Sequence, residues 1–441
     1  MHEIKISADD LVKSLLNLPS ELNLCLLDSC GVSHLNSHLL IAGIQPVEIL
    51  ELNGDSTEKT LKIFSDKVSK SNLSLIFTIS YDFGLKLNKI KSRHSNKSEP
   101  DIFLALFDAL IIHDYKKNKS YLTGNKKRFD EIQDIISNSA NSLNSANSLN
   151  SGNSQLSSNF TQPGYIEAIE KIHEYIRCGD TYQTNLTQQI RAKLPPNLSP
   201  ETIFQRLRKS HPAPFASFIR RKNDVVISAS PERFFKVEDG KISTSPIKGT
   251  RPRGKNVEED LQLKNELLNS EKDRAENVMI VDLLRNDLGR ICDFGTVEVE
   301  KLYELEEHPS LFHLVSTISG KLRKEVEIAE IIKAVFPCGS ITGAPKIRTM
   351  QIIDEIENTS RGLSMGAIGF ATKQNIIGKR QHLIDLSVAI RTLTIRQNEA
   401  VFNVGGGIVI DSLPENEYEE TLVKARAIFK AIGADENDLK S

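Results

Sequence analysis

The sequence lacks the features that mark several classes of protein. Its five cysteines are an odd number and include no Cys-x-x-Cys pair, which argues against a disulfide framework and a structural zinc site. No stretch reaches the roughly 18 apolar residues of a membrane span, and the first residues lack the apolar run of a secretion signal. Lys and Arg number 56 and Asp and Glu 58, so the net charge of −2 provides no general attraction to nucleic acid or anionic membranes. We therefore expect a soluble cytoplasmic protein with reduced thiols, in which any anion site is local.

A low-complexity tract divides the 441 residues. Between residues 137 and 159 nearly every residue is Ser, Asn, Ala, Gly or Leu, and the hexapeptide Ala-Asn-Ser-Leu-Asn-Ser that starts at Ala140 repeats at once. Such a tract buries too little apolar area to offset its ordering entropy, so residues 137–159 are predicted to be a flexible loop or linker. It separates an amino-terminal region, 1–136, from a larger region, 160–436.

Apolar runs and periodicities predict both strands and helices. Strand-like segments are Leu22–Leu27, Leu73–Ile79, Ala109–His113, Gln183–Ile190, Val225–Ser230, Arg233–Val237, Gly366–Thr372, Leu383–Ile395 and Val401–Ile410. Helical segments are Thr60–Val68, Tyr165–Arg177, Val257–Asn269, Asp273–Arg285, Val326–Val335, Pro345–Asn358 and Glu415–Ile432. Because strands and helices come in long groups and not in strict alternation, the pattern favours an α+β fold over a doubly wound parallel sheet.

A loop punctuated by Pro and Gly concentrates positive charge. Lys248, Arg251, Arg253 and Lys255 fall within eight positions. A solvated basic turn is the simpler interpretation. The alternative is that Lys248 acts as a nucleophile or as a cation in an anion-binding cleft.

The segment from Gly339 to Lys346 superficially resembles a phosphate loop. That motif needs four residues between its glycines and a lysine directly after the second, but here three residues intervene and Lys346 comes late. A Gly-rich turn that enters a helix remains, with Pro345 near the first helical turn. Its exposed N–H groups suit a carboxylate, and an ordinary helix start is the alternative.

Two pairs of carboxylates recur at a spacing of three. Asp273 and Glu276 lie on one predicted helix, and Glu417 and Glu420 lie on another, followed by Lys424. Surface pairing of Glu420 with Lys424 is the simple explanation. If the two helices meet, the four carboxylates suit Mg²⁺, which takes one or two carboxylates and keeps sites for water and substrate.

Three consecutive glycines interrupt the last strand-like segment. Gly405, Gly406 and Gly407 are costly in a strand interior. They indicate either close approach of a ligand to the backbone or a bulge.

Five motifs occur together in the order found in the chorismate-utilising enzymes, which the chain after the tract resembles. The motifs are Ser230-Pro231-Glu232-Arg233-Phe234, Pro246-Ile247-Lys248-Gly249-Thr250-Arg251-Pro252-Arg253-Gly254, Asp282 to Arg290, His313-Leu314-Val315-Ser316 and Gly343-Ala344-Pro345-Lys346. Leu26 to Ser29 and Ser80 to Asp82 resemble the amino-terminal segments of the same family. The resemblance implies a large α+β body of layered antiparallel sheets flanked by helices, with two interleaved lobes and its catalytic region over 160–436.

The resemblance also implies the roles of individual residues. Glu232 would be the general acid and Lys248 the amine that attacks C2 of chorismate. Mg²⁺ would be bound by Glu276 and Glu420, with Asp273 and Glu417 supporting its waters. The residues that would line the substrate pocket are Thr250, His313, Thr342, Arg391, Gly405, Gly407 and Lys424.

Two positions separate the subgroups of the family, and a third departs from the common family pattern. The anthranilate-forming subgroup carries Ala where this chain has Lys248, whereas the aminodeoxychorismate-forming subgroup carries Lys. Gln183 stands where isochorismate and salicylate synthases have a water-activating lysine, so water attack is disfavoured. Ser364 replaces a common Tyr, so one substrate contact is expected to differ.

The resemblance therefore favours amination of chorismate at C4, towards p-aminobenzoate and folate. Ammonia would come from glutamine through a separate amidotransferase subunit. Anthranilate formation is the nearest alternative. A non-catalytic chorismate-binding subunit is a further alternative, for which loss of Glu232, Glu276 or Glu420 would be expected, and all three are present.

Overall fold

The computed structural model describes residues 1–32, 34–35, 37–54, 56–94, 99–139, 154–307, 311–374, 376 and 383–439, and the backbone of residue 140. Helices of this part that flank the sheets are α1 (Ala8–Leu16), α2 (Thr57–Lys70), α3 (Tyr81–Leu87), α4 (Phe129–Ala140), α5 (Gln162–Arg177), α6 (Pro200–Ser210), α7 (Val257–Asn269), α8 (Glu271–Gly289), α9 (Ile328–Val335), α10 (Lys346–Ile356) and α11 (Pro414–Ile432). No helix among these residues is long and apolar enough to cross a membrane.

Two wide sheets form the centre of the molecule. The first contains, in spatial order, β1 (His2–Ile4), β8 (Lys119–Gly124), β7 (Ala109–Asp114), β3 (Leu39–Gly43), β2 (Cys25–Asp28), β11 (Phe215–Arg220), β12 (Val225–Ser230), β21 (Thr392–Arg396), β22 (Glu399–Ile408), β10 (Gln183–Lys193) and β18 (Gly343–Ala344), with β9 (Gln155–Ser158) also on β10. The second contains β15 (Ile247–Pro252), β17 (Leu311–Lys321), β14 (Lys241–Ser245), β13 (Arg233–Glu238), β20 (Leu383–Val388), β19 (Ala367–Thr372), β5 (Ser74–Ile79), β6 (Ile102–Phe107) and β4 (Glu48–Leu52), with β16 (Glu298–Glu307) on β17. Every strand pairing in the described residues is antiparallel.

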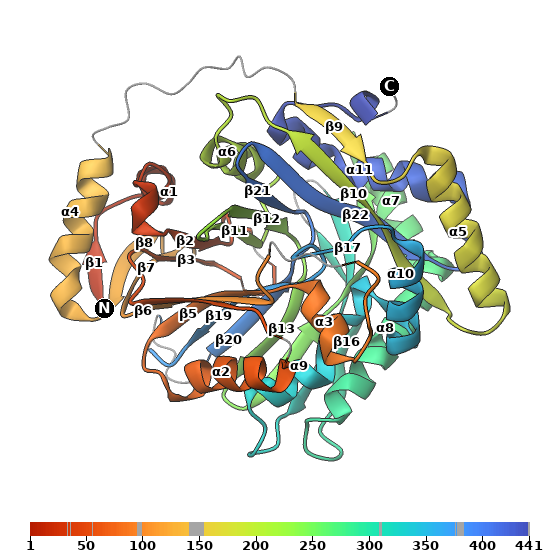
Figure 1. Ribbon diagram of the computed structural model, residues 1–441, viewed down its shortest axis with the longest axis horizontal. Coiled ribbons are helices and arrows are strands. Elements are labelled where there is room, and N and C mark those ends of the chain that lie inside the picture. Colours follow the sequence, from red (N-terminus) through yellow and green to blue (C-terminus); the bar gives the residue numbers. More distant parts are fainter. Residues whose placement is uncertain are drawn as a thin grey trace.

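The sheets are stacked face to face with helices on their outer faces. Residues from both sheets form an apolar layer between them, including Ile76, Phe103 and Ile219. Helices α1, α4, α6 and α11 cover the outer face of the first sheet, and α2, α8 and α9 cover that of the second. The layered α+β sandwich implied by the family resemblance is therefore confirmed (Figure 1).

The amino-terminal and carboxy-terminal regions share both sheets. β2 pairs with β11 in the first sheet, and β5 pairs with β19 in the second. The two regions are therefore interleaved through backbone hydrogen bonds. Residues 137–140 end α4 and 155–158 form β9, while 141–153 of the predicted linker lie outside the described residues.

One predicted strand is wrong in its extent. The segment Leu383–Ile395 divides into β20, in the second sheet, and β21, in the first. Arg391 between them has φ of 49°, in the left-handed region, which ends the extended conformation. The chain therefore crosses from one sheet to the other at this point.

Candidate active site

Glu232 lies at a second crossover between the sheets. It follows β12 of the first sheet and precedes β13 of the second. The Ser230 hydroxyl donates to the Val388 carbonyl at 2.6 Å, and the Val388 N–H donates to the Glu232 carbonyl at 3.1 Å. These bonds fix Glu232 against the end of β20, at the crossover that leads to Arg391.

Burial dominates the electrostatics of the Glu232 carboxyl. The residue is 6% exposed, and burial raises its pKa to about 7, although a hydrogen bond from the Ser340 hydroxyl and the charge of Lys248 both lower it. Its Oε1 atom has no hydrogen-bond partner among the described residues. The group is therefore partly protonated near neutral pH and has one oxygen available for a ligand.

Lys248 lies in a bulge of an edge strand. β15 and β17 pair Ile247 with Val315 and then Thr250 with His313, so one extra residue is inserted on β15. Gly249 has φ of 83°, which favours glycine. A bulge re-aims the adjoining side chains. The charge of Lys248 lowers the pKa values of Glu232, Glu276 and Glu420, so its ammonium group lies within electrostatic range of all three.

The bulge is fixed on both of its sides. A Cβ atom on Gly249 would fall 3.1 Å from Cγ of Asp273, so β15 packs closely against the start of α8. Asp273 also accepts a hydrogen bond from Arg251 at 3.2 Å. On the other side, Thr250 Oγ1 and His313 Nδ1 are 2.9 Å apart.

Glu276 is a partly buried carboxylate on α8. Burial raises its pKa, which Lys248 and Lys272 lower and which Asp273 and Glu417 raise further. Within the described residues Glu276 makes no hydrogen bond or ion pair. It therefore retains both oxygens for a ligand.

The second carboxylate pair lies on α11 beside the triple glycine. Lys424 Nζ is 2.7 Å from Glu420 Oε1 and donates to the Gly405 carbonyl at 3.0 Å. Burial raises the pKa of Glu420, but Lys424 and other lysines outweigh it and hold the pKa below its ordinary value. A Cβ atom on Gly406 would fall 3.3 Å from Glu417 Oε2 and 3.9 Å from Glu420 Oε1. Both carboxylates therefore face the β22 backbone.

These carboxylates suit a magnesium ion in their chemistry. They are hard oxygen donors from α8 and α11, and burial raises the pKa of Glu276 although Lys248 and Lys272 lower it. Lys272 Nζ lies 3.7 Å from Glu417 Oε1, and Lys424 pairs with Glu420. Among the described residues, no three His, Cys, Asp or Glu side chains already form a cluster that could hold a metal. The carboxylates are therefore chemically suited to Mg²⁺, and in this structure Lys272 and Lys424 balance part of their negative charge.

The triple glycine is required by close packing of β22 on β10. Gly405 and Gly407 pair with Thr187 and Asn185 without a shift of register, so the alternative of a bulge is wrong. A Cβ atom would fall 1.9 Å from the Leu186 carbonyl at Gly405 and 2.0 Å from Gln183 Nε2 at Gly407. A side chain at Gly405 or Gly407 would therefore collide with β10, whereas Gly406 faces the charged side chains of α11.

Thr342 and the Gly-rich segment form the adjoining wall. Thr342 is fully buried, and its hydroxyl donates to the Cys338 carbonyl at 3.0 Å. Lys346 does not face a ligand, because it pairs with Asp287 at 2.5 Å and donates to the Val335 carbonyl. The segment is therefore a structural turn, and no phosphate loop is present in it.

Arg391 and Ser364, two positions expected to matter for substrate contact, make no hydrogen bond or ion pair with the carboxylates described above. Burial lowers the pKa of Arg391. The pKa of His211 is lowered first by burial and then by the charge of Arg391, so these two side chains are within electrostatic range of each other. No contact in the described residues joins Arg391 to Lys424, the other cation expected to face a carboxylate of chorismate. Ser364 is buried, and its hydroxyl accepts from the Asn403 N–H at 3.1 Å. At this position the side chain supports β22.

Sequence reasoning missed several groups at the site. Lys272 lies beside the carboxylates, and its only signal is a basic residue in a helical first turn, where acids are favoured. Ser340 lies in the Gly-rich turn, and nothing in the sequence indicated its hydrogen bond to Glu232. Glu357 and Arg361 have the spacing of an ordinary surface ion pair, yet both side chains are almost fully buried.

Comparisons with known proteins identify the family and the fold. Residues 25–430 match the family described as "chorismate binding enzyme". Anthranilate synthase component 1 of Aquifex aeolicus is 37% identical, over 75% of this chain and 68% of its own. Aminodeoxychorismate synthase component 1 of Bacillus subtilis is 35% identical, over 82% and 77%. A solved structure of anthranilate synthase component I from Streptococcus pneumoniae superposes with a TM-score of 0.75 at 27% identity, covering 90% of this chain and 93% of that one.

The matched region includes every strand of both sheets except β1, together with both crossovers and every residue placed at the site above. The family resemblance inferred from the motifs is thereby confirmed, and the chain belongs to the chorismate-binding enzymes.

Proposed function

We propose that this enzyme converts chorismate and ammonia to 4-amino-4-deoxychorismate, the precursor of p-aminobenzoate. The observation that carries the proposal is the position of Lys248, in a bulge within electrostatic range of Glu232, Glu276 and Glu420. An amine nucleophile and a partly protonated acid within electrostatic range of each other are what displacement of an allylic hydroxyl requires.

The reaction follows from these two side chains. Lys248 Nζ, once deprotonated, adds to C2 of chorismate, both ring double bonds shift (C1=C2 to C1=C6 and C5=C6 to C4=C5), and the C4–O bond breaks. Glu232 supplies the proton with which the 4-hydroxyl leaves as water. Ammonia then adds at C4, both double bonds shift back as the Lys248 nitrogen leaves C2, and the proton lost by the added ammonia balances the one taken up by the departing amine.

Magnesium belongs to the proposal as the ligand of Glu276 and Glu420, with Asp273 and Glu417 supporting its waters. The ion would neutralise the ring carboxylate of chorismate. Lys424, beside the Gly405 carbonyl, is proposed to face the enolpyruvyl carboxylate together with Arg391. The other pocket residues, Thr250, His313, Thr342, Gly405 and Gly407, would contact the ring.

Ammonia is proposed to come from a separate glutaminase subunit. The two sheets and their helices account for the described residues, and none of them forms a second catalytic unit with a nucleophilic cysteine. Four of the five cysteines have thiol pKa values raised first by burial, which is unlike an activated nucleophile.

Anthranilate formation is the alternative, because relatives of both names resemble this chain. The presence of Lys248 in place of Ala favours amination at C4.

Replacing Lys248 tests the proposed function. Lys248→Ala should slow aminodeoxychorismate formation from ammonia by at least about 10²-fold, without a matching loss of chorismate binding, and should let ammonia attack C2 directly. Lys248→Arg should be similarly slow, because a guanidinium keeps the charge but is no neutral amine at working pH. Product analysis measures the rate and identity of the product, and mass spectrometry of the Lys248 peptide after quenching detects a chorismate adduct. Near-normal turnover in Lys248→Arg with no chorismate adduct on that peptide would contradict the covalent mechanism.

The pH dependence tests Glu232. Because its pKa is raised to about 7, the acid form is present below that pH and is lost as pH rises through it. At a constant concentration of free ammonia, kcat/KM for chorismate should therefore fall above about pH 7. Ser340→Ala removes a hydrogen bond that favours the charged form, so it should move this fall to higher pH. A descending limb that stays in place in Ser340→Ala would argue against Glu232 as its source.

Magnesium titration tests the carboxylates. Glu420→Gln keeps the volume and removes a charge, so it should abolish activity or raise the Mg²⁺ concentration for half-maximal rate by about tenfold or more. Glu167→Gln on α5 is the matched control, because Glu167 makes the same i,i+4 pair with an exposed lysine, at 2.9 Å. An identical Mg²⁺ curve for wild type and Glu420→Gln would remove Glu420 from the site.

A further inference from the structure

A buried ion pair lies behind the wall of the candidate site. The Arg361 side chain is 1% exposed and the Glu357 side chain 2%. Arg361 donates to Glu357 from Nε at 2.9 Å and from Nη2 at 2.7 Å, and its guanidinium stacks 4.6 Å from the centre of the Tyr81 ring. Removing two charges from water is costly, so such a pair is weak evidence for stability and invites another explanation.

The pair fills a gap at the edge of β10. On one side β10 pairs with β22 over residues 184–193. On the other side, strands of the described residues cover only 183–184, by β18, and 190–193, by β9. Backbone groups in the gap still need partners because they are buried.

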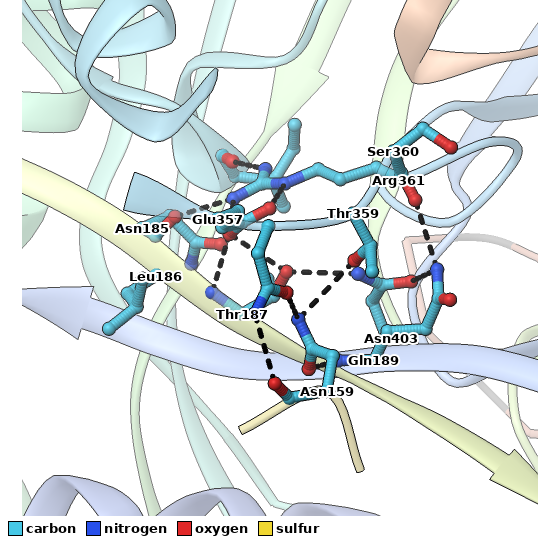
Figure 2. Close-up of polar contacts among 12 residues, drawn as sticks. Asn159, Asn185, Leu186, Thr187, Gln189, Glu357, Thr359, Ser360, Arg361 and Asn403 are labelled. Carbon is cyan, nitrogen blue, oxygen red and sulfur yellow. Dashed lines mark hydrogen bonds and ion pairs between the residues drawn. The ribbon is translucent and has the colours of Figure 1, made fainter. Parts of the chain in front are cut away.

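Side chains and one carbonyl supply those partners. Glu357 Oε1 accepts from the Thr187 N–H at 2.7 Å and from the Thr187 hydroxyl at 2.9 Å. Arg361 Nη2 donates to the Asn185 carbonyl at 2.6 Å, and the Asn185 N–H donates to the Thr342 carbonyl at 2.8 Å. Figure 2 shows Glu357 and Arg361 beside β10, with their bonds to Asn185 and Thr187.

The same guanidinium reaches the turn that carries Thr342. Arg361 Nη1 donates to the Ile341 carbonyl at 3.0 Å, one residue before Thr342. Asn185 and Thr187 are the register partners of Gly407 and Gly405. The ion pair therefore bonds to backbone groups that adjoin three proposed substrate contacts, Thr342, Gly405 and Gly407.

We propose that Glu357 and Arg361 are positioning residues for the chorismate pocket, holding β10 and the Ile341–Thr342 turn at a fixed separation. This inference rests on the proposed function, because the pocket is taken to bind chorismate. It also explains why an ion pair is used in place of a continuous strand. A strand would close the gap through which the turn reaches β10, whereas a planar guanidinium bonds two carbonyls and a carboxylate at once.

Arg361→Lys tests the proposal, with Glu357→Gln as a second variant should the first fail to fold. Lysine keeps the charge but cannot bond Ile341, Asn185 and Glu357 together. Hydrogen exchange should accelerate in peptides covering 183–189 and 339–343 and not elsewhere. Chorismate affinity by calorimetry should weaken by about tenfold or more, and kcat/KM should fall by up to about 10²-fold, as expected for a displaced binding group.

Arg221→Lys is the matched control. Arg221 and Asp224 form an equally buried pair, with Nε 2.6 Å from Oδ1, in the β11–β12 hairpin. This variant should leave exchange in 183–189 and 339–343, and chorismate affinity, as in the wild type.

A double-mutant cycle separates positioning from general destabilisation. Because Arg361 acts partly through Thr342, the loss of kcat/KM in the double variant of Arg361→Lys and Thr342→Ala should be smaller than the product of the two single losses, since one affected contact is already absent. Losses that multiply in the double variant would overturn the proposal, as would exchange in Arg361→Lys that is unchanged or uniformly raised. A wild-type chain that binds no chorismate would refute the proposed function, whereas an unchanged exchange pattern would refute the positioning role alone.

Discussion

The balance of charge around Lys248 is the interaction on which the rest of the site depends. Carboxylates approach it from the crossover at Glu232, from α8 at Glu276 and from α11 at Glu420, and its charge lowers the pKa of each. Each of these elements is held by a different part of the fold. Glu232 lies where the chain crosses from the first sheet to the second, whereas Glu276 and Glu420 come from helices packed on different sheets.

Much of this arrangement was predictable from the sequence. The continuous apolar run that became β5 and the apolar stripe of α11 identified their elements because burial leaves a periodic pattern. The carboxylates of α8 and α11 were correctly paired on two helices by spacing alone. Their meeting was not derivable from spacing, and the family motifs supplied that expectation.

The remaining features depend on long-range pairing that local patterns do not encode. The segment around Arg391 reads as one strand, yet it serves two sheets, because a single residue in the left-handed conformation redirects it. Three glycines suggested a bulge or a ligand. The unbroken register excludes the bulge, and Gly405 and Gly407 also make close contact with β10, which the sequence did not indicate. Glu357 and Arg361 have the spacing of a surface pair, and only the missing stretch of strand beside β10 explains their burial.

Product identification from chorismate tests the account most directly. The purified chain, supplied with Mg²⁺ and either ammonium or glutamine as nitrogen source, is analysed by chromatography and mass spectrometry. The account predicts 4-amino-4-deoxychorismate from ammonium, with the enolpyruvyl group retained on the ring, and no product from glutamine alone. Anthranilate with release of pyruvate, or amination from glutamine by the chain alone, would contradict it.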